Sequence, residues 1–208
     1  MTDRLDQQRA LVAQGCRVAA ARGLVNGILG HLSLRVDDEH LLIRCRSDTD
    51  TGVAFTRACD IRLVTFDGTA GADGELDGYR VPNELPIHVE TMLADPRHRA
   101  IAHLHPPAVV AADLAGIAIR PICGAYDIPG AWLARDGVPV YERAVLIRNS
   151  RLGKEMVAAM RGRPGGDLPR TRDHQRSCHR AAGSAPGDQR RRDSPHVVAG
   201  TCGRRHPA

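Results

Sequence analysis

The run NELPIH that begins at Asn83 and the run HLH that begins at His103 decide how this chain is interpreted. Glu84 and His88 are four residues apart, so they share one face of a helix. His103 and His105 are two residues apart, so they share one face of a strand. A helix that leads into a strand can bring these two faces together. One carboxylate and three imidazoles suit a divalent transition metal, Zn²⁺ above all, and predict a metal-dependent enzyme.

Both halves of this pattern also occur for purely structural reasons. Alternate histidines can mark the polar face of a half-exposed strand, and a glutamate in the first turn of a helix suits the helix dipole. The setting favours a site. An apolar run at 100–102 leads into His103, and Pro106 and Pro107 end the strand directly after His105. Histidines at the end of a buried strand, followed by a turn, lie where binding sites usually form.

Three motifs together resemble the class II aldolase/adducin family over residues 30–160. Members carry a Gly-Asn-hydrophobic-Ser segment, which here runs from Gly30 to Ser33 with His31 in place of the asparagine. They also carry Glu-x-x-x-His on a helix and His-x-His at a strand end. The resemblance implies a mixed α/β (α+β) domain over residues 1–162. Its expected fold is a three-layer sandwich with a central, mainly antiparallel sheet and flanking helices.

The same resemblance implies roles for the site residues. Glu84 would be the catalytic acid/base, and His103 and His105 would bind one divalent metal, Zn²⁺ first, with Mn, Fe or Co as alternatives. His88 and His31 are additional site candidates. In the family a later Arg-Gly-His-Gly segment supplies the third metal histidine, and this chain lacks that segment in its written frame. The resemblance also implies a homo-oligomer, a tetramer, that acts on a small-molecule substrate.

A finer resemblance is to the branch of the family that decarboxylates dihydroxyphthalate and related acids. It rests on PPAVVAAD at 106–113 and GAYDIPG at 124–130. The Thr-Pro-Ser-Gly segment that helps sugar-phosphate aldolases hold phosphate is not intact, and FTRACD at 55–60 is its nearest equivalent. Arg57 in this stretch could meet a substrate carboxylate through its guanidinium fork. The alternative is a solvated loop arginine.

These motifs predict a metal-dependent carbon–carbon lyase, a decarboxylase of a dihydroxyaromatic or related hydroxy-keto acid. The metal would act as a Lewis acid on the substrate, and Glu84 would move the proton. Tyr126 and Tyr141 are either further proton donors or interface and core-edge residues. Three alternatives stay open: an aldolase that cleaves a hydroxy-carbonyl or sugar-type substrate, a non-catalytic scaffold of the adducin kind, and an inactive, truncated or frameshifted family member.

The composition is that of one globular domain in a reducing compartment. The chain has 208 residues, of which 42% are hydrophobic and only 3% aromatic, so the core must rest on aliphatic side chains. No apolar run is long enough to span a membrane, and no signal peptide is expected before the first helix. The six cysteines lack any Cys-x-x-Cys spacing and fit reduced thiols. We therefore expect a cytoplasmic protein without a membrane partner.

The basic charge of the chain lies in residues 163–208. These contain ten arginines and four aspartates, a balance of +6, against +5 for the whole chain, so the preceding residues are close to neutral. No aromatic side chain interleaves these arginines, which argues against a nucleic-acid partner. Leu168 is the segment's single leucine, and it has no Ile, Phe, Met, Tyr or Trp. Such a composition predicts a disordered tail.

A shifted reading frame would explain this tail. One permitted set of codons for residues 169–177, read one base later, encodes Arg-Gly-His-Gly-Ile-Thr-Ser-Gly, which is the segment that the family resemblance requires. The chain has 28 arginines but only one lysine, Lys154, as expected of a GC-rich gene. Out-of-frame translation of such a gene gives a sequence rich in Arg, Pro, Gly and Ala. We therefore predict a frameshift between Gly162 and Gly166. His174 would then be an accident of the frame and not the third metal ligand.

Hydrophobic periodicity and turn signals predict the elements around these motifs. Helices are expected at 5–22 and 150–160, with Gly23 ending the first and Ser150 capping the second. Asn83 is expected to cap the helix that carries the site. Strands are expected at 32–36, 41–45, 62–66, 100–104, 117–122 and 144–147, and a mobile surface loop at 68–78.

Overall fold

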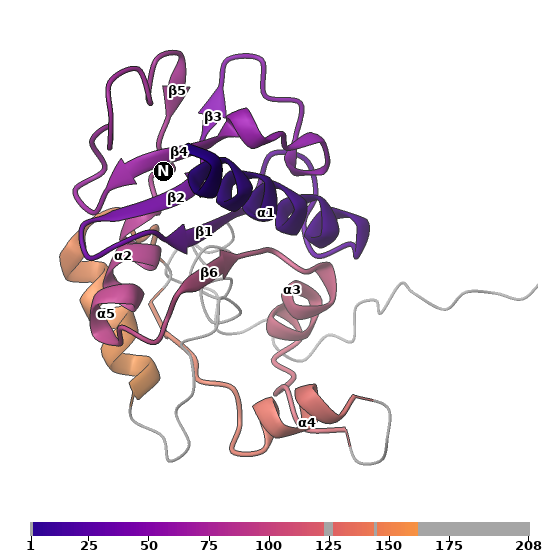
Figure 1. The fold of residues 1–208 in the computed structure, drawn as a ribbon. Helices are drawn as coiled ribbons and strands as arrows, with labels where there is room; N and C mark the ends of the chain where they lie inside the picture. Colours follow the sequence, from indigo (N-terminus) through magenta and orange to yellow (C-terminus); the bar gives the residue numbers. More distant parts are fainter. Residues whose placement is uncertain (1, 123–126, 144, 162–208) are drawn as a thin grey trace, which may run out of the picture.

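The computed structural model describes residues 2–122, 127–143 and 145–161 (Figure 1). The elements follow one another in this order: α1 (Thr2–Ala21), β1 (His31–Arg35), β2 (His40–Arg44), β3 (Arg46–Ser47), η1 (Val53–Phe55), η2 (Ala58–Asp60), β4 (Ile61–Thr65), β5 (Tyr79–Arg80), α2 (Leu85–Ala94), β6 (Ala100–His103), α3 (Pro107–Leu114), α4 (Ile128–Ala134) and α5 (Ser150–Arg161).

Four strands form the main sheet in the order β4-β2-β1-β6, and every neighbouring pair is antiparallel. An acidic turn joins β1 to β2, where Oδ1 of Asp37 accepts hydrogen bonds of 2.8 Å from the backbone N–H groups of Glu39 and His40. β3 and β5 form a separate two-stranded ladder. The prediction of a mainly antiparallel sheet is confirmed.

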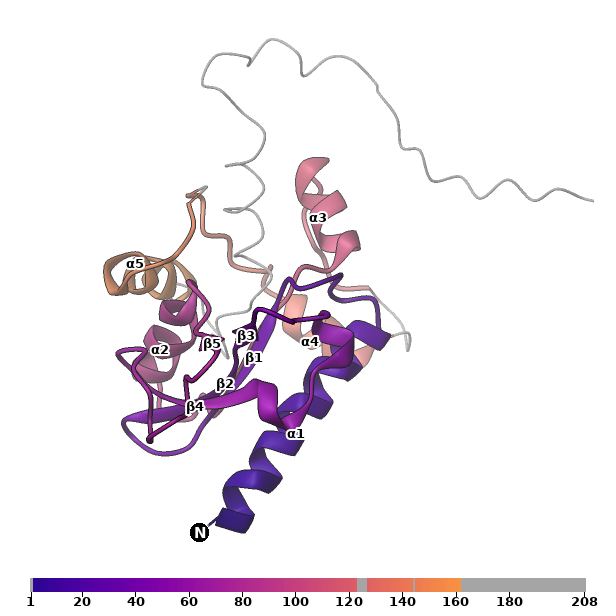
Figure 2. The ribbon, with the colours of Figure 1, turned by 90° about the horizontal axis from the view of Figure 1, so that it is seen from above.

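Helices cover both faces of this sheet. Leu41, Leu42 and Ile43 of β2 are all fully buried, although successive strand residues face opposite sides. Leu42 packs against α1 through Val12, while Leu41 and Ile43 pack against α2 through Met92. α5 lies against the outer side of α2 (Figure 2). The predicted three-layer arrangement of mixed α and β elements is confirmed.

Local signals set the ends of α1 and α2. α1 ends at Ala21, and Gly23 stops it as predicted: this glycine has a φ of 65°, and its N–H donates to the carbonyl of Ala20. The cap of α2 was predicted wrongly, because Glu84 and not Asn83 occupies the cap position. Pro86 lies in the first turn of α2, where its missing N–H has no intrahelical partner to lose.

The cap of α5 also differs from the prediction by one residue. Oδ1 of Asn149 accepts a 3.0 Å hydrogen bond from the backbone N–H of Leu152, and Ser150 is already the first helical residue. Asparagine is as good a cap as serine, so the sequence alone did not decide between the two neighbours.

The strands predicted at 117–122 and 144–147 do not form in the described part of the chain. Residues 117–122 and 145–147 have no strand pairing, and a strand needs a partner ladder as well as an apolar sequence. Two short helices, α3 and α4, were missed. Each begins with a proline in its first turn, and Oδ1 of Asp127 caps α4 by accepting from the N–H of Gly130 at 3.0 Å.

The Gly/Asp-rich stretch at 68–78 is fastened to the body of the protein, contrary to the predicted mobile loop. Glu75 forms ion pairs with Arg9 of α1 and with Arg62 of β4. The N–H of Gly71 donates to the carbonyl of Leu63 at 2.9 Å. These contacts explain how a glycine-rich segment can pack closely against the edge of the sheet.

Two further predictions concern the tail and the absence of a membrane span. The tail at 163–208, with Leu168 and His174, lies outside the described residues. Within the described ranges, no helix is both long enough and apolar enough to cross a membrane.

Candidate functional site

The site begins with two histidines on neighbouring strands. His31 opens β1 and His103 ends β6, and the two are direct antiparallel partners, so their side chains lie on the same face of the sheet. Ser33 and Ile101 form the next pair on that face. Ile101 packs in the core cluster that α2 covers. The two histidines therefore lie on the side of the sheet that faces α2.

Gly30 allows the ends of these two strands to approach each other. Its φ is 92°, and a Cβ atom at this position would lie 3.0 Å from the carbonyl oxygen of His103 and 2.8 Å from Cγ1 of Val25. A larger residue would be strained both by this backbone conformation and by the contacts. The glycine of the Gly-x-hydrophobic-Ser segment thus helps to place His31 opposite His103.

Glu84 brings a carboxylate to the two histidines from the start of α2. Its Oε2 lies 3.6 Å from Nε2 of His31, and its Oε1 lies 3.9 Å from Nε2 of His103. One ligand atom from each of the three residues lies within 4.8 Å of the others. Both histidines are buried, and the Glu84 side chain is only 15% exposed. The carboxylate is therefore held in surroundings that contain little water.

His105 extends this cluster from the residues that follow β6. Its Nε2 lies 2.8 Å from Nε2 of His103, and the two rings are inclined by 61°. Donor atoms around a tetrahedral zinc ion lie roughly 3.3 Å apart, given bonds of about 2.0–2.1 Å. Nε2 of His103 is 2.8 Å from Nε2 of His105 and 3.9 Å from Oε1 of Glu84, and these two distances lie on either side of the value for zinc ligands.

His88 contacts His31 on the side of the ring away from the Glu84 carboxylate. The prediction that Glu84 and His88 share one face of a helix is wrong. Because Glu84 precedes the helix, only His88 is helical. Nε2 of His88 is 2.7 Å from Nδ1 of His31, and Nδ1 of His88 is 2.6 Å from Oγ of Ser33. All three residues are buried. Ser33 received no role from the sequence, although it belongs to the Gly-x-hydrophobic-Ser segment.

The residues present fit a divalent metal. Nε2 of His31 is buried and has no hydrogen-bond partner among the described residues, so a polar atom faces the cluster. Imidazole nitrogens with a carboxylate are donors that Zn²⁺ and its neighbours in the first transition row accept. Burial lowers the pKa of His31 below its ordinary value, and the nearby Glu84 carboxylate opposes this shift. The lowered pKa favours the neutral form of His31, which is the form that a metal ligand must have.

The lowered pKa of His31 predicts how the stability of the metal-free protein depends on pH. Above about pH 6.5 neither the folded nor the unfolded chain carries a proton on this ring. As the pH falls below that value, the unfolded chain takes up a proton that the folded protein excludes, so the free energy of unfolding decreases. Urea unfolding should show this loss in the parent. The slope in His31→Phe should be shallower by up to about 1.4 kcal/mol per pH unit. Superimposable slopes would contradict the assignment.

A comparison with models of protein families identifies the family of this chain. Residues 10–170 match the model described as Class II Aldolase and Adducin N-terminal domain. The chain belongs to this family. Two curated relatives are named 3,4-dihydroxyphthalate decarboxylase: the protein from Rhodococcus jostii (strain RHA1) is 70% identical over 161 residues, and that from Terrabacter sp. (strain DBF63) is 62% identical over 157 residues. The matches cover 77% and 76% of this chain, but only 66% of either relative, which is less than two thirds.

Solved structures of the class II aldolase family share the fold. An aldolase II superfamily protein from Pseudomonas syringae superimposes with a TM-score of 0.61 at 21% identity, over 76% of this chain and 60% of that one. An L-fuculose 1-phosphate aldolase from Glaciozyma antarctica PI12 gives 0.54 at 20% identity, over 76% and 59%. At these identities the likeness concerns the fold alone. The predicted family and fold are confirmed.

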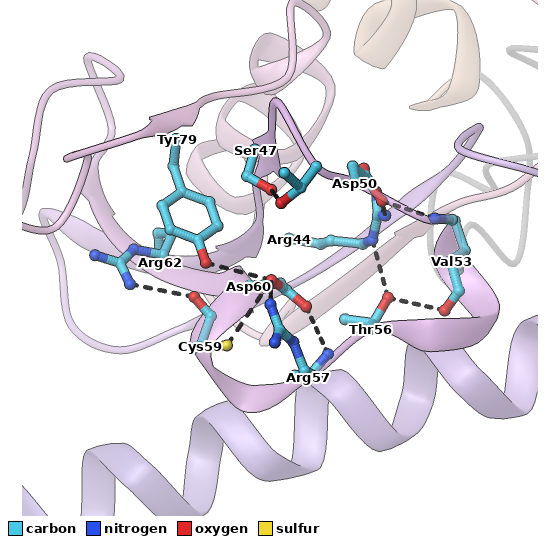
Figure 3. A network of polar contacts seen from close by, with 12 residues as sticks. Arg44, Ser47, Asp50, Val53, Thr56, Arg57, Cys59, Asp60, Arg62 and Tyr79 are labelled. Atoms are coloured by element: carbon cyan, nitrogen blue, oxygen red, sulfur yellow. Dashed lines mark hydrogen bonds and ion pairs between the residues drawn. The ribbon is translucent and has the colours of Figure 1, made fainter.

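The remaining candidates lie elsewhere or outside the described residues. The Arg57 side chain is 70% exposed and pairs with Asp60 at 3.5 Å (Figure 3), as expected of a solvated loop arginine. Tyr141 donates a 3.2 Å hydrogen bond to Glu155 and packs in the cluster between α2 and α5. Tyr126 is not among the described residues, and neither is His174.

The stretch that replaces the phosphate-holding segment is built around a buried ion pair (Figure 3). The Arg44 guanidinium donates to both carboxylate oxygens of Asp50, at 2.6 and 2.8 Å, and to Oγ1 of Thr56 at 2.9 Å. The Thr56 hydroxyl in turn donates to the carbonyl of Val53 at 2.8 Å. The hydroxyl of Thr56 is thus engaged in holding the segment between β3 and β4.

Asp50→Ala should destabilise the protein by about 3–5 kcal/mol, because it leaves the buried Arg44 charge without its partner. The Arg44 side chain is only 3% exposed. Asp48→Ala is the matched control, since its ion pair with Arg80 is highly exposed on both sides and should matter little. Urea unfolding of both variants measures the difference, and equal losses would show that the buried pair has no special weight.

Proposed function

We propose that this chain is a metal-dependent carbon–carbon lyase that decarboxylates a dihydroxyaromatic acid of the 3,4-dihydroxyphthalate type. The observation that carries the proposal is the convergence of the Glu84 carboxylate on His31 and His103, next to His105. The substrate class is supported by the names of relatives that are 70% and 62% identical to the chain. Because the chain spans less than two thirds of those relatives, their activity comes to it as part of this proposal.

His103 and His105 would hold the metal, with the Glu84 carboxylate beside it. Zn²⁺ is the first choice, and Mn, Fe or Co would accept the same donors. When bound, a divalent ion supplies Lewis-acid stabilisation of negative charge on substrate oxygens. The buried surroundings of His103 strengthen such electrostatic interactions by excluding water.

Glu84 is suited to the proton transfer that decarboxylation requires. The bond between a ring carbon and its carboxylate breaks, carbon dioxide leaves, and the electron pair stays on the ring carbon. A proton must then be added to that carbon to give a dihydroxybenzoate. Glu84 lies at the edge of the buried cluster, where it can give up this proton and recover one from water. The reaction consumes no oxidant or reductant.

Metal binding gives the first test of the proposal. The protein with the restored reading frame should bind close to one Zn²⁺ per subunit, and His103→Ala or His105→Ala should abolish this binding, because each removes one of few ligands. His40→Ala is a matched control, since His40 pairs with Asp37 in the β1–β2 turn. Metal content after dialysis is the measurement. Full occupancy in the double variant His103→Ala/His105→Ala would refute the site.

The reaction itself is tested by product analysis. Incubation of 3,4-dihydroxyphthalate with the protein that has the restored reading frame should release carbon dioxide and a dihydroxybenzoate. Formation of an aldehyde from a hydroxy-carbonyl or sugar-type substrate would favour the aldolase alternative instead. The proposal includes a cytoplasmic homo-oligomer, a tetramer, which sedimentation of the purified protein would test.

A further inference from the structure

We propose that Ser33, His88 and His31 form a hydrogen-bond chain in which each residue donates to the next, so that the Nε2–H group of His31 is presented to a carboxylate of the substrate. In this arrangement His31 binds the substrate beside the metal, and His88 is a positioning residue. The choice of a carboxylate ligand rests on the function proposed above. The hydrogen-bond chain itself rests on the geometry of these three buried residues.

The three side chains are connected through consecutive short contacts. Oγ of Ser33 lies 2.6 Å from Nδ1 of His88, and Nε2 of His88 lies 2.7 Å from Nδ1 of His31. A neutral imidazole has one donor and one acceptor nitrogen, so fixing the role of one atom fixes the whole chain. Two directions are possible. His31 presents either an Nε2–H donor or an Nε2 lone pair to the site.

The Glu84 carboxylate selects the donor direction. Its Oε2 is 3.6 Å from Nε2 of His31, where a lone pair would be repelled by the negative oxygen and an N–H is attracted. With the proton on Nε2, Nδ1 of His31 must accept from the Nε2–H of His88. Nδ1 of His88 then accepts from the hydroxyl of Ser33. Every hydrogen bond of the chain is satisfied in this direction.

One nitrogen of His31 lies within 4.8 Å of ligand atoms of Glu84 and His103, but the orientation of the rings favours a place for His31 beside the metal that His103 and His105 would hold, and not among its ligands. The rings of His31 and His103 are stacked, with centroids 4.8 Å apart and planes inclined by only 14°. An imidazole binds a metal in the plane of its ring, so two stacked rings direct their nitrogens side by side. The rings of His103 and His105 are inclined by 61°, which lets their nitrogens meet at one point.

An anionic oxygen is the acceptor that this N–H group requires. Among the described residues Nε2 of His31 forms no hydrogen bond, since the Glu84 carboxylate approaches it only to 3.6 Å, and a buried donor without a full hydrogen bond is costly. A substrate of the phthalate type carries two adjacent carboxylates. An oxygen of one carboxylate could reach Nε2 of His31 while the rest of the ring lies near His103. The N–H group of His31 would then distinguish carboxylated rings from rings without a carboxylate.

The first test measures ligand binding to the Zn²⁺-loaded, full 208-residue chain by calorimetry, with phthalate and catechol as probes. His31→Phe keeps the ring shape but removes the donor. It should weaken phthalate binding by about 10- to 100-fold, the range for a hydrogen bond to a charged group, and leave catechol binding within about twofold. Zn²⁺ affinity should be unchanged. Loss of Zn²⁺ as severe as in His103→Ala would make His31 a ligand and overturn the proposal, as would unchanged phthalate binding.

The second test measures the tautomer of His31 by ¹⁵N NMR in the metal-free full chain. The parent should show the Nε2–H form. His88→Phe should give a mixture of tautomers and weaker phthalate binding, whereas His88→Gln, which keeps a donor, should restore much of both. His98→Gln is the matched control, because His98 is a buried histidine that contacts the Thr91 carbonyl at 3.1 Å. An Nδ1–H form in the parent, or equal effects of the two His88 variants, would refute the positioning role.

These readouts separate this inference from the proposed function. Neither the tautomer nor the binding of Zn²⁺ and phthalate depends on turnover. If 3,4-dihydroxyphthalate releases no carbon dioxide but the binding pattern holds, the proposed reaction is rejected and the role of His31 stands. If carbon dioxide is released but His31→Phe binds phthalate normally, the proposed reaction stands and the role of His31 is rejected.

Discussion

Glu84→Gln should lower the rate of carbon dioxide release by about 10²–10⁴-fold, the range that proton transfer by a positioned side chain contributes. The amide has the same shape as the carboxylate, so the fold should be unchanged and the metal should remain bound through His103 and His105. Single-turnover measurements with 3,4-dihydroxyphthalate at saturating Zn²⁺, together with metal content and thermal unfolding, would establish all three points.

A second acid on the same helix provides the control for this variant. Glu90 lies on α2 and is 7% exposed. Its side chain packs next to Gly153 of α5 and not next to the histidine cluster. Glu90→Gln should therefore keep a rate close to that of the parent. A near-normal rate in Glu84→Gln would show that another group moves the proton. A rate loss that is equal in the two variants would point to a general effect of altering α2.

Much of this site could be predicted from the sequence because its spacings are short. Side chains two residues apart on an extended chain point the same way, and the rings of His103 and His105 are in contact as this alternation predicts. β6 ends within one residue of its predicted end. Glu84 reaches the cluster although the prediction placed it on the helix. Its side chain needs only to start near the first turn of α2, so an error of one residue in the cap did not move it out of the cluster.

The place of His31 depends on information that a single sequence does not hold. His31 enters the cluster because β1 pairs with β6 in the register that sets it opposite His103. These two residues are 72 positions apart, and the register is fixed by packing under α2. The contacts of His88 could not be predicted for a related reason. Helical spacing describes one face of α2, whereas the contacts of His88 come from the strand beneath it.

The missing strands show the same limit. Residues 117–122 have a suitable apolar pattern, but Ile117 and Ile122 are 60% and 57% exposed. Within the described residues the sheet ends at β6, whose second edge has no strand beside it. Strand formation depends on partners far away in the chain, so a correct local pattern did not suffice. The helices α1 and α5, whose main signals are local, were predicted within about three residues at each end, and α2 begins within one residue of its predicted start.

Restoring the reading frame near residues 162–166 should raise thermal stability, the yield of soluble protein and metal affinity together. The composition of residues 163–208 gives them little apolar surface to bury, whereas the alternative frame restores an Arg-Gly-His-Gly segment and the sequence beyond it. Each large apolar side chain buried in a core contributes roughly 2–5 kcal/mol, against a total stability of about 5–15 kcal/mol, so a few regained contacts have a large effect. The returned histidine would add a third metal ligand to His103 and His105.

Sequencing the DNA across the codons for residues 160–170 gives the direct test, and the two proteins can then be compared side by side. The written chain should be cut rapidly by trypsin after Arg163 and should bind Zn²⁺ more weakly than the restored one. His174→Ala in the written chain should change neither property, because in this frame the histidine has no role. A written chain that is monodisperse, as stable as the restored protein and equally active would refute the frameshift. Loss of Zn²⁺ in His174→Ala would then make His174 the third ligand.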